Sequence, residues 1–167
     1  HADAYPAVYA WGNSDEGNGV TVSYDNCTIN GRVVYGNDKI SDTVTNGVAK
    51  INDTHYLTLP KAMAAAKNGE TVTLLRDTAI SSQITVRADL TLDLGGNTLT
   101  NSGTGYAIVV DADKAFTLTN GTLKSDNGSG VSGAGRTNIT IEKTATINAK
   151  VDALVGTRGE VLEGHAM

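Results

Sequence analysis

Two aspartates separated by one residue, Asp111 and Asp113, are the carboxylates best placed by the sequence to hold a cation. In an extended loop, residues i and i+2 point to the same side, so these two carboxylates face one way. Carboxylate oxygens are the ligands that Ca2+ prefers. A solvated acidic turn is the simpler interpretation of the same residues. We therefore treat Asp111 and Asp113 as a candidate Ca2+ site and expect no other cofactor.

Tyr9 and Trp11 are the best candidates for ligand binding among the few aromatic residues. They are two positions apart, so an extended strand places both rings on one side. Asn13 and Asp15 follow in a polar loop and can hydrogen-bond sugar hydroxyls. The alternative is that the rings fill the interior or cover an end of the fold. These four residues are the candidate glycan site.

Composition excludes several other kinds of chemistry. Cys27 is the only cysteine, so an intrachain disulfide and a cysteine-based metal site are excluded, and the thiol is most simply a small core residue. The 167 residues carry a net charge of −5 with a pI near 5.0, which argues against a nucleic-acid-binding surface. The sequence has no apolar run of about 20 residues, so we expect no membrane insertion.

A repeated motif must position these candidates. It consists of an apolar residue, a threonine and an apolar residue, and it occurs at Val72–Leu74, Ile84–Val86, Leu90–Leu92, Phe116–Leu118 and Ile139–Ile141. A second apolar position follows three of these motifs, at Leu99, Leu123 and Ile147. Alternation in a strand directs the apolar residues inward and the threonine outward. Each repeating unit is therefore predicted to consist of short strands joined by turns, with no helix between them.

The spacing of the motif favours vertical stacking. Leu92, Leu118 and Ile141 are separated by 118 − 92 = 26 and 141 − 118 = 23 positions. A period of about 20–50 residues is typical of solenoids, in which each unit buries its inner face against its neighbours. A β-sandwich would also have short strands, but the sequence has few two-residue hairpin signals. We therefore predict an all-β parallel β-helix in which these three residues form one column.

The outward threonines of the motif are predicted to form a ladder if their strands share one face of the solenoid. Equivalent residues of stacked coils lie about 4.8 Å apart. The predicted members are Thr73, Thr85, Thr91, Thr117 and Thr140.

One short helix is predicted at about 58–68. Thr58 is a plausible N-cap, Pro60 lies in the first turn, and Asn68-Gly69 ends the helix. The open end of a β-helix would expose strand edges and an apolar cross-section. We expect the helix to cover that end with Leu57, Met63 and Ala66 directed inward.

The sequence predicts two parts, a coil with a connector at 1–50 and the β-helix domain at 51–167. Val20–Val22 is another copy of the motif, and Ile29 is assigned to a second strand. Residues 33–53 are interpreted as a connector with one or two weak strands. The first part is either the end of a preceding solenoid or a coil packed on the main one. The chain begins with His1 and shows no terminal cap, so we expect a piece cut from a longer protein.

Residues 56–96 carry a family resemblance. They contain Tyr-Leu-Thr-Leu-Pro-Lys-Ala-Met-Ala-Ala-Ala-Lys-Asn-Gly-Glu-Thr-Val-Thr-Leu-Leu-Arg-Asp and later Leu-Thr-Leu-Asp-Leu-Gly-Gly. This stretch resembles the beginning of pectin-lyase-like right-handed β-helix domains of bacterial surface and secreted proteins, including adhesin-like proteins. The resemblance implies a right-handed coil and an extracellular or cell-surface location. It does not specify an activity, because the superfamily includes enzymes, adhesins and stalks.

Lyases of this superfamily use calcium-binding carboxylates with an Arg or Lys base. Asp93 with Arg136, or the aspartate pair with Lys114, matches those residue types, whereas Asp93 is also explained as an outward residue between inward leucines. We assign no catalytic residue. The leading expectation is a non-enzymatic spacer or adhesin that contacts a glycan or a host surface protein. The alternatives are a polysaccharide lyase or glycoside hydrolase, and a solenoid that self-associates through its end coils.

Overall fold

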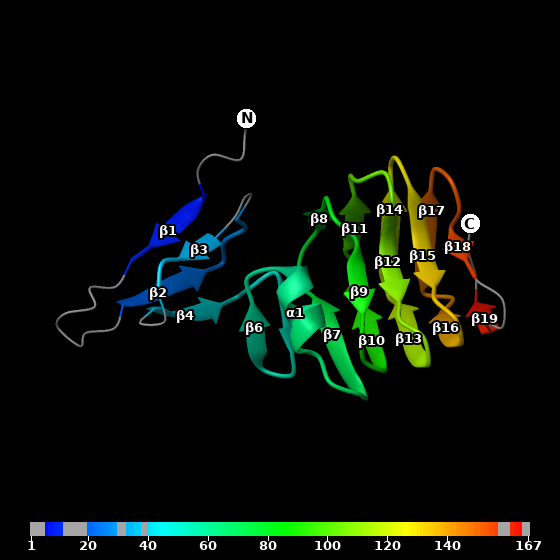
Figure 1. The fold of residues 1–167 in the computed structure, drawn as a ribbon, viewed down its shortest axis with the longest axis horizontal. Coiled ribbons are helices and arrows are strands. Elements are labelled where there is room, and N and C mark those ends of the chain that lie inside the picture. Colours follow the sequence, from blue (N-terminus) through cyan, green and yellow to red (C-terminus); the bar gives the residue numbers. More distant parts are fainter. Residues whose placement is uncertain (1–5, 12–19, 30–32, 38–39, 157–160, 165–167) are drawn as a thin grey trace.

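The computed structural model describes residues 6–11, 20–29, 33–37, 40–156 and 161–164, and its main part is a β-solenoid (Figure 1). Successive turns of the chain contribute one strand to each of three stacked sheets. The first sheet contains β5 (Ala49–Ile51), β6 (Thr54–Tyr56), β7 (Glu70–Leu74), β10 (Leu90–Asp93), β13 (Lys114–Thr119), β16 (Thr137–Ile141) and β19 (Val161–Gly164). The second contains β8 (Thr78–Ile80), β11 (Thr98–Asn101), β14 (Gly121–Ser125) and β17 (Ala145–Ala149). The third contains β9 (Ile84–Val86), β12 (Tyr106–Val110), β15 (Ser129–Gly133) and β18 (Leu154–Val155).

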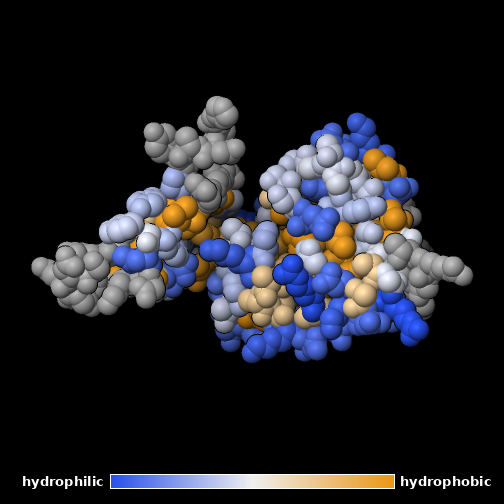
Figure 2. Space-filling model, viewed as in Figure 1, coloured by the Kyte–Doolittle hydropathy of each residue, from blue (hydrophilic) through white to orange (hydrophobic). Residues whose placement is uncertain are grey.

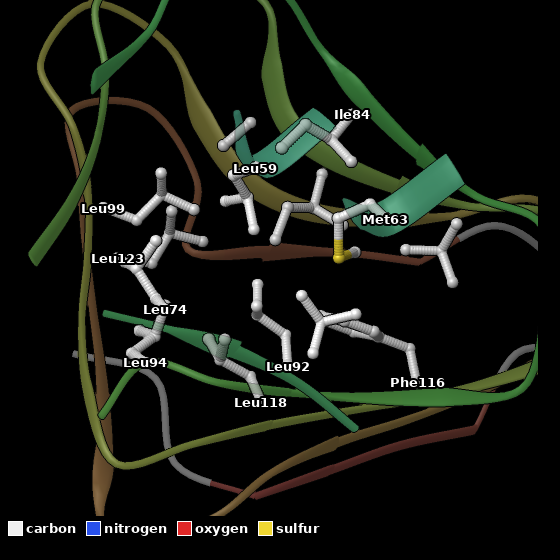
Figure 3. Packing of buried hydrophobic residues seen from close by; sticks show 14 of the residues in the cluster. Leu59, Met63, Leu74, Ile84, Leu92, Leu94, Leu99, Phe116, Leu118 and Leu123 are labelled. Carbon is white, nitrogen blue, oxygen red and sulfur yellow. The ribbon is translucent and has the colours of Figure 1, made fainter. Parts of the chain in front are cut away.

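The strand register confirms the predicted stacking. β10 pairs in parallel with β13, and β13 with β16, so that Leu92 lies beside Leu118 and Leu118 beside Ile141. On the second sheet, Leu99, Leu123 and Ile147 form a column in the same way. Figure 3 shows leucines from different turns converging on one interior. The buried apolar residues of these turns belong to one continuous cluster.

The predicted threonine ladder is correct only in part. Thr91, Thr117 and Thr140 occupy one column on the first sheet. Thr85 lies on the third sheet, where it pairs with Val109. Each turn makes three strands, so copies of the motif fall on different faces.

The first copy of the motif is also shifted by two residues from its predicted position. Thr71 pairs with Thr91, and Thr73 pairs with Asp93. A strand can move by two residues and keep the same side chains inward, because side chains alternate with a period of two. The sequence of β7 alternates over its whole length and therefore fits both registers.

The predicted capping helix is α1 (Leu59–Ala65), and it is shorter than expected. The Thr58 hydroxyl accepts a hydrogen bond from the Lys61 N–H at 3.3 Å, which confirms the N-cap. The chain leaves the helix at Ala66, which is extended, because a turn tied by the Glu70 carboxylate follows. Leu57, Met63 and Ala66 are buried as predicted.

An antiparallel pairing that was not predicted completes the cap. β5 pairs antiparallel with both β6 and β7, so the parallel order of the first sheet ends at β7. Val48 joins this region twice, since its N–H donates to the Tyr56 carbonyl and its carbonyl accepts from the Leu75 N–H. β5 and β6 therefore cover the edge of β7 at this end of the first sheet.

The N-terminal unit consists of β1 (Val8–Ala10), β2 (Val20–Asp25), β3 (Val33–Tyr35) and β4 (Ile40–Thr45). β1 pairs in parallel with β3, and β2 with β4. Residues 33–53 thus contain more than the one or two weak strands predicted, and Ile29 lies outside any strand. β3 and β4 fit the predicted weak strands, since their apolar residues are only half-buried, and β5 is the additional strand of this range.

Candidate functional site

The aromatic pair on β1 is the candidate site that the structure shapes most clearly. The ring centroids of Tyr9 and Trp11 are 6.5 Å apart and their planes differ by 21°, so the rings are stacked. Tyr9 is 56 % exposed and Trp11 is 64 % exposed. The alternative in which these rings fill the interior is therefore wrong. Large exposed aromatic surface is costly unless it has a partner, so the pair can act as a platform for a ligand with an apolar face.

The position of Trp11 depends on Gly36, which follows β3. The Gly36 N–H donates to the Ala10 carbonyl at 2.8 Å and so continues the pairing of β1 with β3. A Cβ added at Gly36 would come within 2.2 Å of the Trp11 ring atom Cε3. The indole thus lies directly against a backbone that lacks a side chain. Asn13 and Asp15, the polar members predicted for this site, lie outside the described residues.

The candidate Ca2+ ligands are adjacent but have separate environments. Asp111 Oδ2 lies 4.0 Å from Arg87 Nε, and both side chains are well exposed, so this ion pair is weak. Asp113 is exposed and has φ of +61°, and its N–H donates to the Arg136 carbonyl. Within the residues that the structure describes, groups of three or more His, Cys, Asp or Glu suited to a metal do not occur. Two carboxylates supply only part of the six to eight oxygens that Ca2+ takes, so the site stays a prediction.

The carboxylate of Asp93 has a structural role. Its Oδ1 accepts from the Gly95 N–H at 2.8 Å and from the Asn120 side-chain amide at 3.2 Å, which ties two turns together. Asp93 ends β10, whereas Arg136 immediately precedes β16. Because these strands are parallel members of one sheet, the two residues lie at opposite ends of it. The structure does not bring this pair together.

Sequence reasoning missed a polar cleft of about 540 Å³ between β4 and β6. Its ionisable lining residues are Asp42, Asp53, His55 and Lys61. His55 Nδ1 accepts the Gly47 N–H at 3.0 Å, which leaves the other ring nitrogen as a donor. These residues come from three elements, and their spacing in the sequence gives no signal that they meet.

A hydrogen-bonded chain of hydroxyls leads to this cleft. The Tyr24 and Tyr35 hydroxyls are 3.3 Å apart, and the Tyr35 hydroxyl donates to Asp42 Oδ2 at 2.7 Å. Burial raises the pKa of Tyr35 well above its usual range, and the hydrogen bonds to Tyr24 and Asp42 add to the rise. The Asp42 carboxylate is therefore already engaged on one side.

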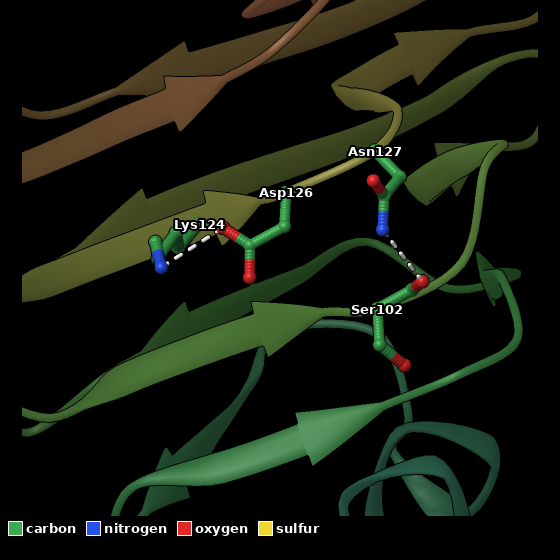
Figure 4. Close-up of polar contacts among 4 residues, drawn as sticks. All are labelled: Ser102, Lys124, Asp126 and Asn127. Atoms are coloured by element: carbon green, nitrogen blue, oxygen red, sulfur yellow. Dashed lines mark hydrogen bonds and ion pairs between the residues drawn. The ribbon is translucent and has the colours of Figure 1, made fainter.

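The outer face of the second sheet carries a different set of polar groups (Figure 4). Lys124 Nζ and Asp126 Oδ1 are 2.9 Å apart, and the Asn127 side-chain amide donates to the Ser102 carbonyl at 3.3 Å. The Asn127 contact joins neighbouring turns of the solenoid. Hydrophilic residues likewise line the lower rim of the solenoid in Figure 2. These groups stabilise corners and surfaces, and they do not converge on one point.

Comparisons with protein-family models, curated proteins and solved structures found no match for this chain. Among the described residues, every helix is too short or too polar to cross a membrane. The structure itself identifies the chain as a β-solenoid with a short capping helix.

Proposed function

We propose that this chain is a non-enzymatic module of an extracellular bacterial surface protein of the pectin-lyase-like kind, and that it binds glycan through Tyr9 and Trp11. The observation that carries the proposal is the stacked and exposed aromatic pair on β1. The solenoid would serve as a rigid spacer that holds the two aromatic rings away from the surface to which the protein is attached. The enzymatic alternative is less well supported by the described residues, because Asp93 is engaged in a turn and does not lie near Arg136.

Stacking on sugar rings explains why this pair suits a glycan. The C–H faces of a sugar are apolar, and its rim of hydroxyls stays hydrated, so an exposed flat ring gains contact without burying polar groups. The two stacked rings remain 56 % and 64 % exposed, so the ring surface that they do not cover on each other is open to a sugar unit. The Gly36 backbone supports the indole and fixes the platform before the ligand arrives, which lowers the entropy cost of binding.

The rigid support follows from the core. One buried cluster runs through the solenoid from Val48 to Ile147. Close-packed interiors transmit displacement and do not bend easily. A stalk built in this way keeps its length under load.

The test uses Trp11, which is the only tryptophan of the chain. Its fluorescence is recorded while pectic oligosaccharides and mucin-type glycans are added. We expect one of these classes to change the Trp11 emission with saturation. Tyr9→Ala should weaken that binding by about tenfold, equivalent to the loss of one stacking contact of about 1.4 kcal/mol.

Two controls separate binding from folding and from catalysis. Tyr106→Ala removes a tyrosine that is 37 % exposed on β12, and it should leave binding unchanged. Trp11→Ala is measured on a glycan array, because it removes the fluorophore, and it should lose the signal. A blank array and an unchanged emission would reduce the module to a spacer. Release of unsaturated or reducing ends from the same glycans would instead support the enzyme.

A further inference from the structure

One strand edge at the N-terminal end of the solenoid is uncovered. β8 is the last strand of the second sheet at that end. The first sheet continues beyond β7 into β5 and β6, and α1 packs against β9 of the third sheet. Among the described residues, β8 has a strand partner on one side only, which is β11. Uncovered edges present unpaired backbone donors and acceptors, which are templates for another strand.

The direction of the free backbone groups follows from the pairing of β8 with β11. Ala79 pairs with Thr100, and the Ser102 N–H donates to the Ile80 carbonyl at 2.9 Å. In a parallel ladder, successive residues direct their N–H and C=O groups to opposite neighbours. Since the backbone carbonyl of Ile80 faces β11, the backbone N–H and C=O of Ala79 face the open edge. Ala79 is also exposed.

A cavity of about 660 Å³ adjoins this edge. Residues 77–82 form one wall, and they include the whole of β8. The other wall contains the half-buried Ile29 and the exposed Pro60, with Leu57 and Leu59 buried behind them. Ser81 and Ser82 contribute hydroxyls. An exposed strand edge beside an apolar wall is the arrangement that peptide-binding domains use when they add a strand from a partner.

We propose that this cavity binds an extended peptide segment of another chain, which pairs with β8 as a further strand of the second sheet. An apolar side chain of the peptide would lie against Ile29 and Pro60, which are the accessible apolar residues of the opposite wall, so the chemistry required is an apolar residue between small or polar ones. The sheet of β8, β11, β14 and β17 continues through the added strand. The end of a second solenoid does not fit here, because β6 and α1 cover the neighbouring sheets. A single strand fits.

This surface is independent of the aromatic pair on β1, since the two sites share no residue. The failure of glycan binding therefore says nothing about the peptide, and the reverse is also true.

The first experiment uses a peptide that already has the right pattern. Residues 121–126, Gly-Thr-Leu-Lys-Ser-Asp, cover β14, which stacks in this same sheet. The peptide is made with a blocked carboxyl end and an N-terminal fluorophore, and its anisotropy is measured as the full chain is added. We expect saturable binding. Anisotropy that stays flat up to about 1 mM protein, the upper end of weak specific affinities, would overturn the proposal.

Backbone methylation then distinguishes an added strand from a side-chain contact. One peptide carries N-methyl groups at its Thr and Lys positions, and a second carries them at its Leu and Ser positions. In a strand only one of these sets faces β8, so we expect one peptide to bind about tenfold more weakly and the other to bind like the parent. Equal binding by both methylated peptides would contradict strand addition.

A variant of the protein tests the same edge from the other side. Ala79→Pro removes the N–H that faces the cavity and leaves the ladder with β11 intact, as proline is tolerated on edge strands. We expect about tenfold weaker binding of the parent peptide, whereas Ala79→Val, which keeps the N–H, should bind as the original chain does. Circular dichroism confirms the fold of both variants. If Ala79→Pro does not fold, the two methylated peptides decide the question.

Discussion

At the residue scale, the polar side chains of this protein mainly join one turn to the next. The Asn97 side-chain amide donates to the Leu74 carbonyl of the preceding turn and to the Leu94 carbonyl of its own, each at 3.1 Å. Inside the core, the Asn101 amide donates to the Ser125 hydroxyl at 3.1 Å. Buried polar groups of this kind are stabilising only when they are fully paired. The carboxylate of Asp93 and the amides of Asn97 and Asn101 thus serve the structure.

The first prediction concerns Tyr35. Tyr35→Phe removes the hydrogen bond to the Asp42 carboxylate and should lower the free energy of unfolding of the N-terminal unit by about 1–2 kcal/mol, as expected for a half-exposed charge-assisted bond. Chemical denaturation followed by circular dichroism measures this change. Tyr106→Phe, at an exposed position, is the control and should stay within about 0.5 kcal/mol.

Tyr35 also makes the stability of the fold depend on pH. Its pKa is raised in the folded chain, so the fold favours the neutral phenol. An unfolded tyrosine ionises near pH ~10. Tyr35 therefore contributes its full stabilisation of the fold below pH ~10, and this stabilisation is lost as the pH rises toward the pKa of Tyr35 in the folded chain. We expect the original chain to lose stability above pH ~10 more steeply than Tyr35→Phe, and parallel curves would contradict this.

At the scale of elements, the corners decide how closely the turns stack. Gly128 lies between turns, where an added Cβ would come within 2.1 Å of the Gly105 carbonyl oxygen. Backbone cannot move aside as a flexible side chain can. Gly105, directly opposite, has open space at its own Cβ position.

This difference gives a matched pair of variants. Gly128→Ala should lower the free energy of unfolding by about 1–3 kcal/mol, because it forces the turns apart, as overpacking does elsewhere. Gly105→Ala should change it by less than about 0.5 kcal/mol. Thermal and denaturant unfolding of the two variants measure the difference. Equal effects would show that the stacking at this corner is loose.

The capping helix supplies the next prediction. Thr58→Ala removes the hydroxyl that accepts from the Lys61 N–H and should cost about 1 kcal/mol of stability. Thr58→Ser keeps the oxygen and should restore most of the loss. Hydrogen exchange locates the effect, which we expect in the first turn of α1, at Lys61, and in β9, against which the helix packs. An effect spread evenly over distant strands would contradict a local cap.

At the scale of the whole molecule, we infer that the described residues form two parts, because the buried cluster of the solenoid does not extend into β1–β4. The main apolar cluster begins at Val48 and includes no described residue of the N-terminal unit, whose buried tyrosine is Tyr24. Stacked turns stabilise one another through nearest-neighbour contacts, whereas a pair of two-stranded sheets has little core of its own.

We therefore expect two unfolding steps. Leu118→Ala should destabilise the later step by about 2–5 kcal/mol, because Leu118 is fully buried in the solenoid, and should leave the first step unchanged. Tyr24→Ala should affect only the first step. Hydrogen exchange resolved by residue measures both, with β1–β4 expected to exchange before β10–β14. A single transition shifted by both variants would show that the parts unfold together.

Much of the fold was predictable because inward residues repeat at the spacing of the solenoid. The columns of Leu92 with Leu118 and of Leu99 with Leu123 follow directly from that spacing. Thr58 was predictable as a cap because capping depends on local chemistry. The candidate site was less predictable. Tyr9 and Trp11 were expected to share a side, but their exposure depends on what packs over them, which adjacent residues do not reveal.

By itself, the sequence determined that strands alternate, that their apolar residues point inward and that successive turns stack, because these follow from local periodicity and from the need to bury a shared face. Only the tertiary structure decided the register of β7, the antiparallel cap made by β5 and β6, and the open edge of β8. Shifts of two residues leave every side chain on the same face, and strand edges depend on which distant segment arrives beside them. Both are therefore invisible in the sequence pattern.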